Sequence, residues 1–496
     1  MYHGNEMMRK LKIPVLVAGG LLFLTLLWSV VLSGFNYRFD ADELFNANSI
    51  YLMLKGLMPY KDFYTVYSPI LHWILTPVFL ITGFNFSAIA EARAVMIGFF
   101  LIRLLLIFLL ADRIFNRRIA VLSVVLYLLN PFTVFADMQI RPDNLMMLFY
   151  LLFLVVFISA VNTKSSRLYF LTGILLGITM LTNIKIIPSV VVFILVFTHF
   201  AWRNTLLKQL LLVFDGAIAS FFVFFGYFFI QGYAPEMFLH VFLDAFRLNQ
   251  SVPYPTWLGY FYFSNPVIYG FEGKPLNWMF AWMLPLIAFA GAYVIFKSSF
   301  REKKGQVVTK HILCYSLAAQ WISMLFINSV FIQYYIPLNW LYGLFGAVFI
   351  DDLIFQSEIP SFERNILRGT IFLFFVTLTA SSFFANINRS KWNSVELVTQ
   401  YESLWAQIPE NQPVFPNLLF RPTVYPILAG ATFAPYMRDR YEPAYAMIEK
   451  KKLPYLVELN DEYFSYLDSE SQMYIRKNYQ PDPKDPRFWL KIEKEK

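Results

Sequence analysis

Long apolar segments are the feature that most constrains how this 496-residue chain can fold. A transmembrane helix needs about 20 consecutive, mainly apolar residues. Such segments lie near 13–33, 93–112, 119–136, 144–161, 168–183, 186–201, 209–231, 277–296, 311–330, 336–354 and 369–387. They predict about 11 transmembrane helices, and the first is longer than the apolar core of a usual signal peptide. A hydrophobic fraction of 58% and a mean hydropathy of +0.52 agree with a polytopic membrane protein.

Basic residues in the short loops predict the orientation of these helices. Loops rich in Lys and Arg stay in the cytoplasm. Six such clusters occur in alternate loops: Arg9/Lys10/Lys12, Arg113/Arg117/Arg118, Lys164/Arg167, Arg203/Lys208, Lys297/Arg301/Lys303/Lys304/Lys310 and Arg364/Arg368. All six share one side if the N-terminus is cytoplasmic, and an odd number of spans then puts the C-terminus outside. If the apolar segment 69–83 spanned the membrane, every later basic cluster would lie on the opposite side. We therefore predict that this segment is interfacial or re-entrant.

Composition divides the chain into a membrane domain, 1–387, and a tail, 388–496. The predicted topology gives the membrane domain a long first external loop, 34–91, and a second one, 232–277. The tail pattern predicts a helix at 443–452, a strand at 454–459, an amphipathic helix at 462–478 and a strand at 488–493. We therefore expect an all-α polytopic membrane domain with a small extracytoplasmic α/β domain.

Several function classes are excluded by what the sequence contains. The net charge is +8, but the tail carries equal numbers of basic and acidic residues, so the excess follows membrane topology and does not predict nucleic-acid binding. Cys314 is the single cysteine, which excludes a disulfide framework and a cysteine metal site. No P-loop, dinucleotide fingerprint or zinc-protease motif occurs.

Three acidic residues follow the first apolar segment: Asp40, Asp42 and Glu43. Asp40 and Glu43 have the spacing of a capping box, which is one interpretation of both residues. The box does not need Asp42. A carboxylate at the membrane surface could instead orient or deprotonate an attacking hydroxyl.

External cations oppose the positive-inside trend, so each one suggests a specific partner. Arg141 and Asp143 open the fourth span, where Asp143 could cap the helix or belong to a site, and where Arg141 could bind a phosphate through two parallel hydrogen bonds. Arg93 and Lys185 could also bind a phosphate, or could lie among lipid headgroups. Arg103 lies within a span, and we expect it to form a structural pair with a polar group on a neighbouring helix.

Ordered sequence blocks carry a family resemblance. They lie at 42–43 (DE), 56–62 (GLMPYKD), 67–69 (YSP), 91–93 (EAR), 112–118 (DRIFNRR), 130–131 (NP), 141–143 (RPD), 173–185 and 333–337 (QYYIP), with KLPYLV at 452–457 in the tail. The arrangement resembles the GT-C superfamily of polyprenyl-phosphate-dependent glycosyltransferases. The bacterial protein O-mannosyltransferase-like and lipid A aminoarabinose transferase branch is the most similar.

The resemblance implies a site on the outer face of a bacterial inner membrane. It makes Asp42 the catalytic carboxylate, with Glu43 and Asp143 as further acidic residues, and it implies inversion at the sugar. Ser68 stands where relatives of the aminoarabinose branch carry a phosphate-binding lysine, and Gln333 replaces a common cation. We therefore expect the donor phosphate to meet other side chains, namely Arg141, Arg93, Lys185, Tyr334 and Tyr335.

The resemblance implies a polyprenyl-phosphate-sugar donor and a lipid, glycan or protein acceptor. It makes no cofactor certain, and it leaves a divalent cation open. Two other classes compete with a transferase. A polymerase or ligase of surface polysaccharide would be expected to use external arginines. A transporter would be expected to show repeats and polar residues near the middle of the membrane, where this chain has only Arg103.

Overall fold

The computed structural model describes residues 2–492 except 131–133, 135, 245–246, 248–274, 299–303, 328–331, 357–359, 417, 423–441, 458, 460–463 and 466. Each of the eleven apolar segments overlaps a helix. These helices are α1 (Tyr2–Asn36), α4 (Phe86–Ile114), α5 (Arg117–Leu129), α6 (Pro142–Thr163), α7 (Ser166–Thr182), α8 (Ile187–Arg203), α9 (Leu207–Ile230), α12 (Pro275–Ser298), α13 (Lys304–Met324), α14 (Ile336–Asp351) and α15 (Ser361–Ser390). Within the described residues, six helices are long and apolar enough to cross a membrane by length and composition.

The end of α5 departs from the prediction for a local reason. The segment 119–136 is helical only to Leu129, where Asn130 is extended at φ −83° and ψ 95°. Residue 131 is proline, and the residue before a proline avoids the α region. Pro188 lies in the first turn of α8, where its missing N–H costs no helical hydrogen bond.

The first external loop contributes two helices, α2 (Ala41–Leu54) and α3 (Ile70–Thr82). Helix α3 covers the segment 69–83 and has 13 residues, too few to span a bilayer. It packs against α2 and α4. Of the second predicted external loop, the structure describes α10 (Ala234–Phe238) and the π-helical segment η3 (Leu239–Asp244), and the rest lies almost entirely outside the described residues.

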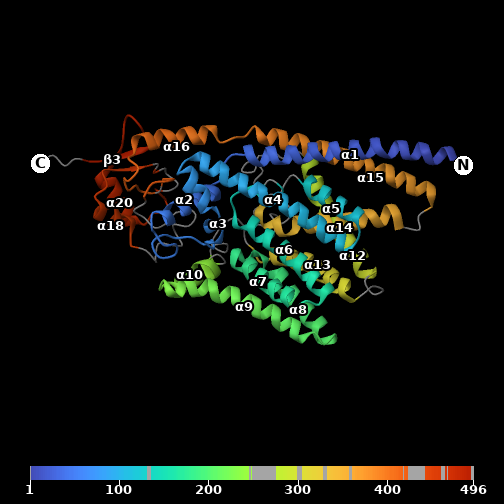
Figure 1. Cartoon of the computed structure of the whole chain (residues 1–496). Coiled ribbons are helices and arrows are strands. Elements are labelled where there is room, and N and C mark those ends of the chain that lie inside the picture. Colours follow the sequence, from blue (N-terminus) through green and yellow to red (C-terminus); the bar gives the residue numbers. More distant parts are fainter. Residues whose placement is uncertain are drawn as a thin grey trace.

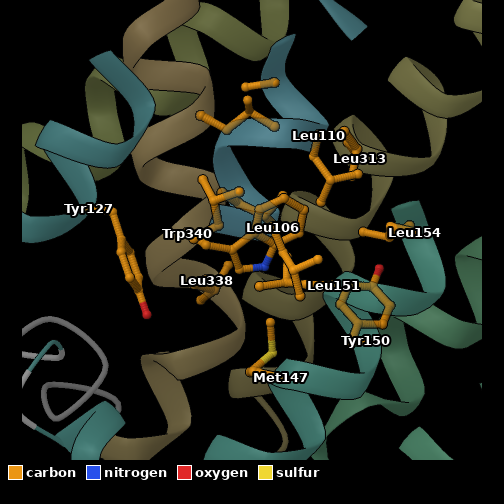
Figure 2. Packing of buried hydrophobic residues seen from close by; sticks show 14 of the residues in the cluster. Leu106, Leu110, Tyr127, Met147, Tyr150, Leu151, Leu154, Leu313, Leu338 and Trp340 are labelled. Carbon is orange, nitrogen blue, oxygen red and sulfur yellow. The ribbon is translucent and has the colours of Figure 1, made fainter. Parts of the chain in front are cut away.

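The core of the bundle is built from large apolar side chains of α4, α5, α6, α13 and α14. Trp340 is 1% exposed and lies among Leu106, Leu151 and Tyr150, as Figure 2 shows. Glycines let backbones approach elsewhere: a Cβ on Gly173 of α7 would lie 2.0 Å from the Val213 carbonyl oxygen of α9. Helices α1 and α15 run side by side along one edge of the molecule (Figure 1).

The tail begins with α16 (Val395–Gln407) and then forms a small α/β unit. Its other elements are α18 (Ala444–Lys451), β1 (Tyr455–Val457), α20 (Ser469–Asn478), β2 (Tyr479–Pro481) and β3 (Phe488–Lys491). The sheet order is β1-β3-β2 with antiparallel pairs. The predicted helix at 443–452 and the predicted strands at 454–459 and 488–493 are therefore confirmed, and the second helix begins later than predicted. The tail lies beside α2 and α3 at the end of the bundle opposite the N-terminus (Figure 1).

Candidate active site

The site begins at the N-terminus of α2. Asp40 is the N-cap: its carboxylate accepts hydrogen bonds from the backbone N–H groups of Asp42 at 2.7 Å and Glu43 at 3.3 Å. The Glu43 carboxylate accepts the Asp40 backbone N–H at 3.2 Å, which completes the capping box. The predicted box is thus confirmed, and it leaves the Asp42 side chain for other contacts.

Arg141 joins this helix to the start of α6. One guanidinium nitrogen donates to Asp42, a second donates to Asp40, and Nε donates to Gln139 at 2.8 Å. Arg141 is buried at the N-cap position, where Pro142 begins α6 with a fixed φ. Arg141 is therefore the cation that neutralises the carboxylates of Asp40 and Asp42.

Asp143 pairs with Lys185. Asp143 lies in the first turn of α6, and it receives a hydrogen bond from Lys185 Nζ at 2.7 Å. Lys185 belongs to the 3-10 turn η2 (Ile184–Ile186) between α7 and α8. The side chain of Asp143 thus turns toward a residue 42 positions away, while its neighbour Arg141 turns toward α2.

Lys185 also lies over an aromatic ring. Its Nζ is 4.2 Å from the centroid of Tyr334 in the 3-10 turn η6 (Ile332–Tyr335). A cation over the face of a tyrosine is attracted by the ring quadrupole. Tyr335, in contrast, packs toward Trp321 of α13, with ring centroids 6.5 Å apart. The structure therefore brings Tyr334 to the charged cluster and directs Tyr335 into the bundle.

Asp40, Asp42, Arg141, Asp143 and Lys185 form one electrostatic cluster, which we call the acid–base cluster. Burial raises the pKa of the Asp42 carboxyl above its usual range; Arg141 and Lys185 oppose this rise, and Asp40 and Asp143 add to it. Asp42 has the most exposed side chain of the five at 33%, against 21% for Lys185. An accessible carboxylate with a raised pKa suits a group that accepts a proton.

Glu43 and Arg93 lie beneath this cluster and form an enclosed pair. Arg93 donates through Nε to Glu43 at 2.9 Å, through a second nitrogen to the same carboxylate, and also to the carbonyl oxygens of Phe35 and Tyr37. Their side chains are 1% and 0% exposed. Arg93 was expected to bind the donor phosphate, and Glu43 was expected to be a further acidic residue of the site. Because enclosed side chains do not reach a substrate, we now expect this pair to have a structural role.

The Arg93–Glu43 pair has a structural consequence. Glu43 also accepts the backbone N–H of Ile140 at 3.1 Å, so it ties α2 to the segment that carries Arg141. Loss of one partner of such a buried pair costs about 3–5 kcal/mol, since the other charge stays buried without compensation. The structural pair that we expected for Arg103 is confirmed. Arg103 contacts Asp137, and Asp137 also accepts a hydrogen bond from Tyr127.

Three residues near the acid–base cluster were not assigned to the site from the sequence: Tyr67, Asn46 and His72. Burial raises the pKa of the Tyr67 phenol well above its usual range, and the Asp42 carboxylate adds to this rise. Asn46 and His72 hydrogen-bond to one another at 2.8 Å and are both fully buried. A polar residue four positions after Asp42 on a helix was the available signal for Asn46, because it lies on the same helical face.

A metal site finds no support among the described residues. They contain no group of three or more His, Cys, Asp or Glu side chains that could hold an ion. The carboxylates of Asp40 and Asp42 both pair with the Arg141 guanidinium.

The fold is similar to solved membrane glycosyltransferases. The apo oligosaccharyltransferase of Archaeoglobus fulgidus aligns with a TM-score of 0.55 at 13% identity, covering 95% of this chain and 74% of that chain. ArnT from Cupriavidus metallidurans aligns with a TM-score of 0.52 at 12% identity when bound to undecaprenyl phosphate, covering 96% and 97%. Its apo state aligns with a TM-score of 0.54 at 13% identity, covering 96% and 98%.

These similarities define a class of protein. At such identities a structural likeness establishes the fold alone, and this chain shares the fold of the oligosaccharyltransferase and of ArnT. Residues 67–228 match, in particular, the family described as dolichyl-phosphate-mannose-protein mannosyltransferase. The resemblance to the GT-C superfamily is confirmed. No curated protein sequence gives a significant match.

Proposed function

We propose that the protein transfers a sugar from a polyprenyl-phosphate donor to an acceptor hydroxyl on the extracytoplasmic face of a bacterial cell membrane. The observation that carries the proposal is the acid–base cluster, in which the accessible Asp42 carboxylate lies in the field of Arg141 and Lys185. Such a site needs an acceptor for the hydroxyl proton and cations for the leaving phosphate. The family match and the structural similarity to ArnT with undecaprenyl phosphate support this donor class.

The chemistry is a single displacement. The acceptor hydroxyl oxygen attacks the anomeric carbon, the bond from that carbon to the phosphate oxygen breaks, and the phosphate leaves with the electron pair. The hydroxyl proton passes to Asp42. One displacement inverts the anomeric centre, and no covalent enzyme intermediate is needed.

Lys185 is the best placed group to bind the donor phosphate. Its ammonium is partly exposed and contacts the Asp143 carboxylate and the Tyr334 ring. Arg141 is buried, and two of its nitrogens donate to carboxylates on α2. We therefore assign the phosphate contact to Lys185 with Tyr334 beside it, and we assign Arg141 to the orientation of Asp42. Asp143 would orient the lysine.

A carboxylate as the most exposed group of the cluster favours a transferase over a polysaccharide polymerase or ligase, for which an exposed arginine was expected. We further propose that the membrane domain comprises 1–387, with about 11 spans and a cytoplasmic N-terminus. The tail, 388–496, would then be extracytoplasmic.

The test is turnover of purified donor lipid by the full-length protein. Undecaprenyl-phosphate-linked mannose and aminoarabinose serve as probes, with release of undecaprenyl phosphate as the readout. Asp42→Asn removes the charge and keeps the size, so turnover should fall about 10²–10⁴-fold. Lys185→Ala should lose about 10²–10³-fold, and Lys185→Arg should retain part of the activity since the charge remains.

Asp62→Asn is the matched control. Asp62 is an exposed carboxylate in the same loop, and it accepts the Met58 backbone N–H at 2.8 Å. It should turn over donor at the parental rate. An Asp42→Asn variant with full activity and normal folding would refute the catalytic assignment.

A further inference from the structure

Asn46 ties together the two segments that carry the acid–base cluster. Its side-chain nitrogen donates to the Asp42 carbonyl oxygen at 2.7 Å and to the Ile140 carbonyl oxygen at 3.0 Å. The first contact lies within α2, and the second reaches the residue directly before Arg141. One amide group therefore fixes how the backbone of Asp42 lies relative to the backbone of Arg141.

His72 of α3 fixes the orientation of this amide. Its Nε2 is 2.8 Å from Asn46 Oδ1. Since the amide nitrogen already serves two carbonyl groups, Oδ1 is the acceptor, and His72 Nε2 must carry the proton. Burial lowers the pKa of His72 to about 4, so the ring is neutral near pH 7. Hydrogen bonds thus run from His72 through Asn46 to both segments.

A packing role alone does not account for His72. Its side chain is fully buried, and Nδ1 has no hydrogen-bond partner among the described residues. A buried polar atom without a partner is destabilising, whereas an apolar ring of the same size would fill the space without that cost. What the imidazole adds is the single N–H that holds Asn46.

We propose that Asn46 and His72 are positioning residues that hold the Asp42 carboxylate against the Arg141 guanidinium in the geometry needed for transfer. The inference rests on the proposed function. Both side chains are fully buried, so neither touches a substrate, and both act through Asp42. Their loss should lower kcat and leave the KM for the donor lipid nearly unchanged, because the proposed phosphate contact at Lys185 is made by other elements.

The experiment compares His72→Phe, His72→Gln and Asn46→Ala in the purified full-length protein with the probe that the parent turns over. Phe keeps a planar ring and removes the N–H donor, and Gln restores an N–H that can reach Asn46. A small misplacement of a catalytic group can cost about 100-fold, so His72→Phe and Asn46→Ala should lower kcat by roughly 10–100-fold. His72→Gln should recover most of that loss. Ser49→Ala, which removes a hydroxyl that donates to the Phe45 carbonyl oxygen, is the control on the same helix, α2.

A double variant separates a positioning role from general damage. If His72 acts through Asp42, then His72→Phe should cost nothing further in an Asp42→Asn background. Losses that multiply would overturn the inference, as would a parental kcat in His72→Phe or an effect on the donor KM alone. An inactive Asp42→Asn with a fully active His72→Phe refutes this inference and leaves the proposed function standing.

If the parent turns over neither probe, the proposed function fails for those donors, and hydrogen exchange decides the positioning claim. His72→Phe must then speed exchange of the amides at 43–46 while the amides of α6 keep their protection. Unchanged exchange at 43–46 would refute it.

Discussion

Arg141 lowers the pKa of the proposed catalytic carboxylate, Asp42, against the effect of burial, and this gives a pH prediction. Burial is the largest influence on Asp42 and raises its pKa, while Arg141 is the largest influence that lowers it. Activity needs the ionised carboxylate, so kcat/KM should fall as the pH drops through this pKa. Arg141→Ala removes the lowering influence, and the acidic limb of the kcat/KM profile should move to higher pH.

Arg141→Lys is the matched variant for this measurement. A lysine keeps the positive charge but cannot contact Asp40 and Asp42 through two fixed nitrogens, so the shift of the acidic limb should be intermediate. Because the Arg141 side chain is buried, each lost charge-assisted hydrogen bond should also lower the free energy of unfolding by about 1.5–3 kcal/mol. An acidic limb that stays in place in Arg141→Ala would show that Arg141 does not control Asp42.

At the scale of single residues, the sequence predicted local relations and missed distant ones. The Asp40–Glu43 capping box follows from a spacing of three residues, which is visible in any helix start. The pairing of Glu43 with Arg93 joins residues 50 positions apart, and Lys185 meets Asp143 across 42 positions. Spacing cannot reveal such pairs, because they depend on how α2, α4, α6 and η2 pack.

Helices α7 and α9 approach closely at two glycines, and this yields a prediction for an element. A Cβ on Gly173 would lie 2.0 Å from the Val213 carbonyl oxygen, and one on Gly216 would lie 2.1 Å from that of Phe170. Gly173→Ala and Gly216→Ala must therefore push the helices apart. Because α7 leads directly into η2 and Lys185, we expect lower thermal stability together with weaker donor binding, seen as a raised donor KM.

Gly226→Ala on α9 is the control, since a Cβ at Gly226 would have no described atom within 4 Å. It should match the parent or gain slightly, because alanine is the better helix former. Parental stability and KM in Gly173→Ala would mean that the close approach does not position Lys185.

Elements were predicted best where one strong local signal decides them. Each of the eleven apolar segments overlaps a helix, because a single long apolar segment in lipid satisfies its own backbone hydrogen bonds only as a helix. The end of α5 was predicted seven residues too late, although Pro131 was a usable stop signal. The packing of α3 beside α2 was beyond reach, since it depends on tertiary contacts of a short helix.

At the scale of the whole molecule, the proposed topology has a direct test. Reporter fusions after Lys496 should report an extracytoplasmic location, and a fusion after Arg118 should report a cytoplasmic one, because the Lys and Arg clusters fall on one side. A fusion within 240–270 should agree with the C-terminal one. If the fusion after Lys496 is cytoplasmic, the number of spans is even, and the interfacial assignment of 69–83 is the first to be rejected.

The tail also contacts helix α2. Asn48 of α2 accepts the Phe420 backbone N–H at 3.0 Å, and the Phe420 ring is buried beside Tyr51 of α2 and Phe79 of α3. Helix α2 therefore lies between the His72 contact on one side and the Phe420 contact on another. Both restrain the helix whose first turn carries Asp42.

Phe420→Ala should loosen this contact without touching the acid–base cluster. Truncation of a buried phenylalanine costs about 3–5 kcal/mol, so the tail should detach more often and become sensitive to limited proteolysis between 392 and 420. Donor turnover should fall in parallel, because α2 loses its contact with the Phe420 ring. Exposed Met473 lies far from this contact in the sequence, on α20, and Met473→Ala is the matched truncation in the tail that should leave both measurements unchanged. A Phe420→Ala protein that resists the protease yet loses turnover would place Phe420 in the site itself, whereas one that is cleaved and keeps full turnover would show that α2 holds Asp42 without the tail.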